Sequence, residues 1–108
     1  MFHRLPKPLL ARVRIYQDHH IIGEPITPHN CGGPVLHFAS LHLAANVTNL
    51  YILESVRRHY LEEYKGLLTA DHQPVDGEFP LPPGPGLGVE LNPNILKRED
   101  VSIERTSA

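Results

Sequence analysis

The sequence predicts an α/β fold built around a β-strand, an α-helix and a second β-strand, and three features support this prediction. A short apolar run over 21–27 precedes a Gly-Gly-Pro turn at 32–34. An apolar stretch over 35–46 follows, and a second apolar run covers 50–53. One helix between two such runs is typical of parallel strands joined by a right-handed crossover.

The first strand is expected to be short. Pro25 lies inside the apolar run and cannot donate a ladder hydrogen bond. We therefore expect this strand either to span only 25–28 or to lie at the edge of a sheet. Gly32 and Gly33 then permit a tight turn, and Pro34 suits the first turn of a helix.

The helix over 35–46 is apolar almost all round, which predicts packing between neighbours rather than on a surface. The run over 50–53 is continuously apolar, which is typical of a parallel strand covered on both faces. Ser55 can cap a further helix over 56–68. Arg58 and Glu62 would pair on its exposed side, opposite a buried stripe made by Val56, Tyr60, Tyr64 and Leu67.

The remaining chain divides into two outer segments. Residues 1–20 are poorly patterned, although apolar spacing predicts a short helix over about 9–17. Residues 69–108 form a tail rich in proline and glycine, in which Leu87, Val89 and Leu91 alternate as a short strand would. We thus expect an atypical segment over 1–20, a βαβα part over 21–68 and the tail over 69–108.

Composition limits the possible function. The chain has 108 residues, 41% hydrophobic and 20% charged, with a net charge of −2, which gives no reason to expect nucleic acid or membrane as a partner. The lone Cys31 fits a reducing compartment, and no apolar run is long enough to cross a membrane, so a cytoplasmic location is expected. An Arg-rich, acid-free start is the alternative sign of an organelle-targeting segment, but Pro6 and Pro8 interrupt any helix there.

Two polar residues follow the two predicted strands, namely His29 and Glu54. In a barrel of alternating strands and helices, consecutive strand ends lie side by side on the face that carries the chemistry. Both side chains could therefore point into one pocket. The alternatives are that His29 is an ordinary loop histidine and that Glu54 forms a salt bridge with Arg57 or Arg58.

Other candidate motifs are weaker. His37 and His42 lie five positions apart on the predicted helix and do not share a face, which argues against a zinc site. The glycines of 84–88 precede a strand rather than opening a helix, unlike a dinucleotide-binding loop. Nothing nearby activates Cys31 as a nucleophile, so we expect a buried or half-buried thiol.

Three segments carry a resemblance to a known family, with the sequences PHNCGGPV at 28–35, ASLHLAA at 39–45 and YILE at 51–54. They resemble the C-terminal end of the enolase superfamily, and within it the mandelate racemase/muconate lactonizing enzyme group, in particular the galactonate-type acid-sugar dehydratases. The segment PGLGVEL at 85–91 resembles the tail that returns from the barrel to a capping domain. The resemblance covers roughly 21–98, and it implies the last two strands of a (β/α)8 TIM-type barrel with their helices.

The resemblance implies a lyase. Such enzymes remove the proton α to a carboxylate, hold the enediolate on Mg²⁺ and expel the β-hydroxyl as water. His29 would be the general acid/base that protonates the departing hydroxyl, because histidine changes protonation near neutral pH. Glu54 would hydrogen-bond the sugar-acid substrate.

The chain departs from this pattern in its length. A full barrel takes about 250 residues, and the strands that carry the three metal-binding carboxylates and the base have no counterpart here. We expect a partial dehydratase that neither binds Mg²⁺ nor turns over alone, with exposed barrel edges available for self-association. The alternatives are one half of a complemented enzyme and a non-catalytic binding module.

Overall fold

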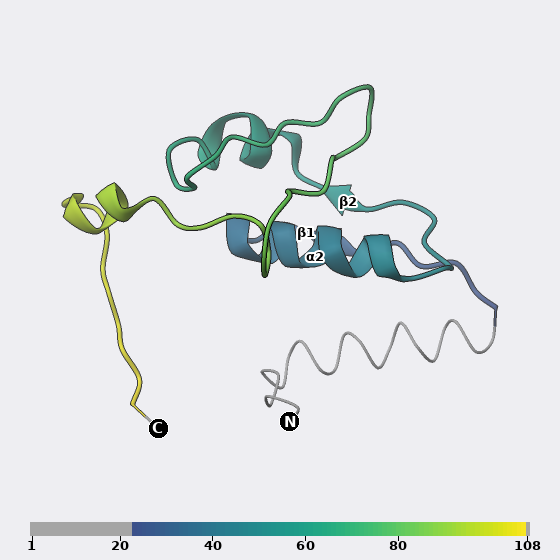
Figure 1. Cartoon of the computed structure of the whole chain (residues 1–108), viewed down its shortest axis with the longest axis horizontal. Coiled ribbons are helices and arrows are strands. Elements are labelled where there is room, and N and C mark those ends of the chain that lie inside the picture. The colour runs from purple at the N-terminus through teal and green to yellow at the C-terminus, as the bar shows by residue number, and fades with distance from the viewer. Residues whose placement is uncertain (1–22, 108) are drawn as a thin grey trace. The chain divides into compact units, whose positions relative to one another are not determined.

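The computed structural model describes residues 23–107 and divides the chain into two compact units, which meet in the sequence between Val56 and Arg57 (Figure 1). The predicted helix over about 9–17, and the rest of 1–20, lie outside the described residues. No helix within the described range is long and apolar enough to cross a membrane.

The first unit contains the predicted βαβ arrangement. Strand β1 (His29–Asn30) is followed by helix α2 (Pro34–Asn46) and strand β2 (Glu54–Ser55). The two strands pair in parallel, with His29 opposite Glu54 and Asn30 opposite Ser55. The α/β class predicted from the sequence is therefore confirmed.

The parallel pairing begins before the two strands. Ile26 bridges Leu50, and its N–H donates to the Asn49 carbonyl at 2.9 Å. The Glu54 N–H then donates to the Pro28 carbonyl at 2.9 Å. Because Pro25 and Pro28 lack an N–H, they cannot donate to the ladder, which explains why pairing over this segment is short and interrupted.

The prediction of a strand over 50–53, covered on both faces, was wrong. Strand β2 begins only at Glu54, and the side chains before it are exposed: Leu50 is 37%, Tyr51 77% and Ile52 57% accessible. The sequence predicted a buried run, but within residues 23–107 the sheet has only two strands, and of this run only Leu53 is half-buried.

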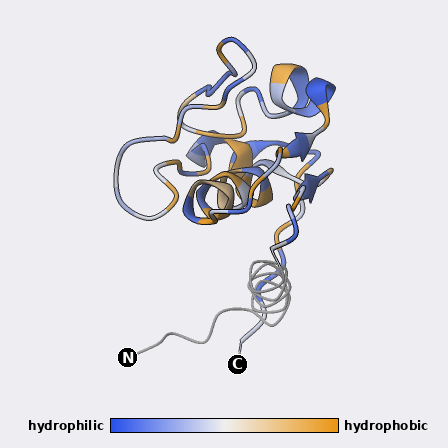
Figure 2. Cartoon of the chain, turned by 90° about the vertical axis from the view of Figure 1, so that its right-hand side faces the viewer, coloured by the Kyte–Doolittle hydropathy of each residue, from blue (hydrophilic) through white to orange (hydrophobic). Residues whose placement is uncertain are grey.

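Helix α2 forms where the sequence predicts it. Gly33 precedes it with extended backbone, Pro34 occupies the first position, and the His37 N–H donates to the Gly33 carbonyl at 3.1 Å. Its apolar residues appear in orange in Figure 2. The buried side is formed by His37, Phe38, Ser40, Leu41 and Ala44, whereas Val35 is 47% exposed. The helix is thus buried on one side, not all round.

The second unit opens with a shorter and wider helix than expected. The predicted helix over 56–68 is instead the π-helix η1 (His59–Glu63), and the Tyr64 N–H donates five residues back to the His59 carbonyl at 2.8 Å. Arg58 approaches Glu62 at 3.7 Å, as predicted. Of the predicted stripe Tyr64 is buried, while Val56, Tyr60 and Leu67 are half-buried. Ser55 is not a helix cap but a residue of β2.

The tail folds back on this unit by a single antiparallel bridge between Leu68 and Leu91. The Thr69 N–H donates to the Glu90 carbonyl at 2.9 Å. The predicted strand over 87–91 was otherwise wrong, because the positive φ of 70° at Gly88 breaks the extended backbone. A 3-10 helix, η2 (Pro93–Lys97), follows.

Candidate functional site

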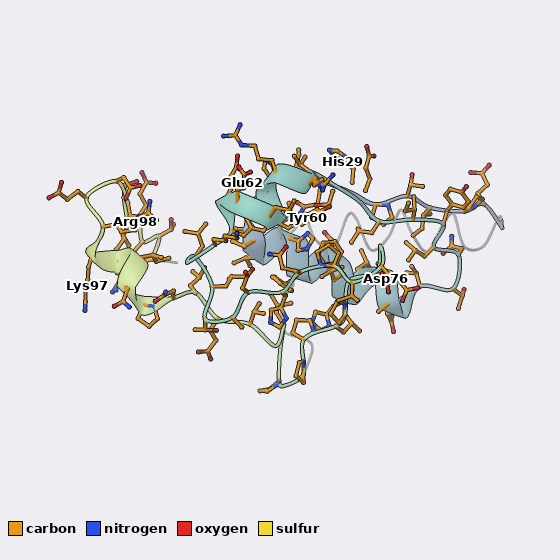
Figure 3. The ribbon with its side chains drawn as sticks, turned by 90° about the horizontal axis from the view of Figure 1, so that it is seen from above. His29, Tyr60, Glu62, Asp76, Lys97 and Arg98 are labelled. Carbon is orange, nitrogen blue, oxygen red and sulfur yellow. The ribbon has the colours of Figure 1, made fainter. Side chains whose placement is uncertain are left out.

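The end of the two-stranded sheet brings His29 and Glu54 together. Residues opposite each other in paired strands project to the same face of a sheet, and His29 is opposite Glu54. The His29 Nδ1 lies 3.1 Å from the Glu54 Oε2, and the two side chains are 52% and 66% exposed. The His29 side chain projects outward from the ribbon (Figure 3).

This contact orients the His29 ring. A carboxylate oxygen accepts, so the His29 Nδ1 carries the proton that it donates to Glu54, whether the ring is neutral or charged. The second ring nitrogen, Nε2, is then the atom that can exchange a proton with a bound molecule. The arrangement is a histidine–carboxylate pair with acid–base capability, open to solvent.

The next residue of each strand faces the other way. Asn30 is completely buried and Ser55 is half-buried, and both approach His37 of helix α2, which is 1% exposed. The Asn30 Nδ2 lies 3.3 Å and the Ser55 Oγ 3.5 Å from the His37 Nδ1. A polar cluster of Asn30, His37 and Ser55 therefore lies directly beneath the exposed pair.

The hydrogen bonds of Asn30 define the state of His37. The Gly32 N–H donates to the Asn30 Oδ1 at 3.0 Å, so the amide nitrogen of Asn30 faces His37 and donates to its Nδ1. A nitrogen that accepts carries no proton, which places the proton of neutral His37 on Nε2. Burial lowers the pKa of His37 from its ordinary value of 6.5 and so favours this neutral form.

The other predicted candidates lie elsewhere. Cys31 is exposed, so the expectation of a buried or half-buried thiol was wrong; it lies where the chain leaves β1 and turns toward α2. Glu54 pairs with His29, while Arg58 pairs with Glu62 and Glu63 within the second unit. His42, five positions after His37, is only half-buried.

Sequence reasoning considered His37 only as a metal ligand and missed its contacts with the strands. The helical repeat and the alternation of side chains along a strand both indicate that these residues face one another. His37 lies four positions before Leu41 and seven before Ala44, on the buried side of the helix. Asn30 and Ser55 each follow a predicted site residue by one position, so strand alternation turns them to the opposite face.

The described residues do not fit a magnesium site. Across residues 23–107, no three histidine, cysteine or acidic side chains come together as a metal-binding group. Mg²⁺ prefers several oxygen ligands in octahedral geometry, and the Glu54 carboxylate is paired with an imidazole instead. No chemical step is therefore assigned to a metal held by these residues.

Comparison with known proteins shows the family to which the chain belongs. The enolase C-terminal domain-like family matches residues 12–95, which is more than half of the chain. The chain belongs to this family. No curated protein matches it.

Solved structures of the enolase superfamily share the fold. An enolase of the mandelate racemase subgroup from Agrobacterium tumefaciens is 38% identical, with a TM-score of 0.67, over 78% of this chain and 23% of its own. A candidate dehydratase from Salmonella enterica subsp. enterica serovar Typhimurium is 34% identical, with a TM-score of 0.70, over 78% of this chain and 21% of its own. The chain thus spans under a quarter of the length of these relatives.

Proposed function

We propose that this chain supplies the acid–base end of a magnesium-dependent acid-sugar dehydratase of the galactonate type. Strands β1 and β2 would be the last two strands of a (β/α)8 barrel, and the tail would lead back toward a capping domain. The observation that carries the proposal is the contact of His29 with Glu54, 3.1 Å apart and opposite each other in two short parallel strands. Strand ends on this face are where barrel enzymes place their catalytic groups.

The reaction gives each residue a role. Loss of the α-proton and of the β-hydroxyl from a 2,3-dihydroxy acid yields an enol and water, and the enol rearranges to a 2-keto acid. His29 would give the proton on Nε2 to the departing hydroxyl, which leaves as water. Glu54, which accepts a hydrogen bond from Nδ1, would stabilise the charged ring and would also form a hydrogen bond with the substrate.

The base and the metal ligands would come from parts of the protein beyond residues 23–107. The isolated chain is then expected to be inactive. A second candidate is one half of an enzyme assembled from two polypeptides, and the exposed apolar Tyr51 and Ile52 favour it over a free-standing module. In either case, His29 and Glu54 perform the same chemistry.

A chimeric enzyme tests the proposal. Residues 23–95 of this chain would replace the matching segment of the Salmonella candidate dehydratase, and 2-keto acid release from a panel of hexonates and pentonates would be measured with Mg²⁺. We expect turnover that His29→Gln lowers at least about a hundredfold, the usual contribution of a general acid. We also expect Glu54→Gln to lower it.

The matched control is Glu78→Gln, an exposed carboxylate of the second unit. It should leave turnover unchanged. Equal turnover of the His29→Gln and Glu78→Gln chimeras would contradict the assignment of His29, and a binding role without catalysis would then be the better account.

A further inference from the structure

We propose that Asn30, His37 and Ser55 act as positioning residues, because together they hold β1 and β2 in the one register that sets His29 beside Glu54. This inference rests on the proposed function only for the role given to His29 and Glu54. The positioning itself is a statement about the fold and is tested separately.

The register of this strand pair is not carried over from its neighbours. The upstream bridge joins Ile26 to Leu50, whereas the strands join His29 to Glu54. Between the two pairings, the chain advances three positions from Ile26 to His29 but four from Leu50 to Glu54. The segment before Glu54 therefore contains one extra residue, as at a β-bulge. The alignment of His29 with Glu54 must be fixed locally.

Backbone hydrogen bonds provide little local support. The strands are two residues long, and Pro28 has no N–H to donate. A slip of one residue would turn every side chain of a strand to the other face. It would carry His29 toward helix α2 and bring buried Asn30 out to solvent.

The buried cluster penalises such a slip. His37 Nδ1 is the acceptor that faces both the Asn30 amide and the Ser55 hydroxyl, at 3.3 and 3.5 Å. Asn30 also accepts from the Gly32 N–H, which ties the cluster to the turn before α2. In a slipped register the buried Asn30 amide would lose this acceptor, and a buried donor without a partner is unfavourable.

The test uses the full chain, labelled with ¹⁵N, in nuclear magnetic resonance. Its readout for position is the Overhauser contact between the His29 ring and the Glu54 side chain. Its readout for the cluster is the protonated ring nitrogen of His37, expected to be Nε2. We expect His37→Leu, which fills the space without an acceptor, to lose the His29–Glu54 contact. His37→Gln retains an acceptor oxygen and should keep it.

His42→Gln is the matched control on the same helix and should leave the contact unchanged. If His37→Leu also abolishes the α2 amide signals, Ser55→Ala decides the question. It removes one of the two groups that face His37 Nδ1, and we expect a weaker His29–Glu54 contact while α2 remains folded. An unchanged contact in Ser55→Ala would contradict the inference.

Several outcomes would overturn the inference. They are a contact that survives in His37→Leu, loss of the contact in His37→Gln with α2 intact, and a proton on His37 Nδ1 in the unmodified chain. None of these measurements depends on turnover. An inactive chimera with the contact intact would count against the proposed function and leave the positioning network standing.

Discussion

The contact between His29 and Glu54 contributes little to the stability of the fold. Both side chains are more than half exposed, and solvent-exposed pairs of this kind are worth about 0–1 kcal/mol. A polar pair that is exposed, aligned by strand register and backed by a buried network is better explained by chemistry than by stability.

The buried His37 predicts a pH dependence of stability. Burial lowers its pKa in the folded state below the ordinary value of 6.5, so on acidification the unfolded chain takes up a proton before the folded chain does. Its contribution to stability is complete above pH 6.5 and falls with decreasing pH until the folded-state pKa is passed. The steepest possible slope for one group is about 1.4 kcal/mol per pH unit.

Urea unfolding between pH 7 and pH 5 measures this effect. His37→Gln, which does not titrate, should show a smaller loss of stability on acidification than the unmodified chain. Parallel pH profiles for the unmodified chain and His37→Gln would contradict this prediction.

The pairing of His29 with Glu54 could be anticipated from the sequence. For the cluster beneath it, periodicity indicates which faces the residues occupy but not that they touch. Polar residues that end apolar runs show where two strand ends meet. Whether Asn30 and Ser55 reach His37 depends on the helix rotation and on the extra residue between Leu50 and Glu54. Neither is encoded in any short pattern of residues.

At the scale of elements, helix α2 was predictable because its signals are local. Gly33 and Pro34 mark its start, and apolar residues continue to its end. The strand boundaries were less predictable, because apolar runs of four to eight residues do not reveal whether another element covers them. The predicted helix over 56–68 shortened to the π-helix η1, which ends at Glu63, and Gly66 with a φ of 74° prevents a helix from continuing to residue 68.

Two glycines of the second unit allow a matched prediction. Gly77 and Gly88 both have positive φ, at 82° and 70°, so alanine at either should cost about 1–2 kcal/mol. At Gly77 a Cβ would meet nothing within 4 Å, whereas at Gly88 it would lie 2.7 Å from the Pro82 carbonyl oxygen. Crowding adds about 1–3 kcal/mol, so Gly88→Ala should destabilise the unit more.

Amide exchange reports this difference locally. The Thr69 N–H, bonded to the Glu90 carbonyl, should lose more protection in Gly88→Ala than in Gly77→Ala. Equal protection in the two variants would contradict this prediction, because it would mean that the backbone around Pro82 can shift to accommodate the added Cβ with no loss of stability.

At the level of the whole molecule, the chain covers less than a quarter of the length of each of these solved relatives. Exposed Tyr51 and Ile52 next to an open two-stranded sheet are consistent with a surface that other parts of a barrel would cover. The family could be recognised from the sequence, because the residues around His29 and Glu54 keep their order and spacing. The substrate could not, since the described residues bring together no metal-binding group to mark where it would bind.

We propose that these residues are one part of a larger catalytic barrel. The size of the native polypeptide tests it most directly, using an antibody against the largely exposed segment 77–90 on extracts of the source. We predict a species several times heavier than 12.1 kDa, in which His29 and Glu54 would act with the metal-binding strands. A single species at 12.1 kDa, with no heavier partner purifying alongside it, would show that these residues do not act within a larger barrel.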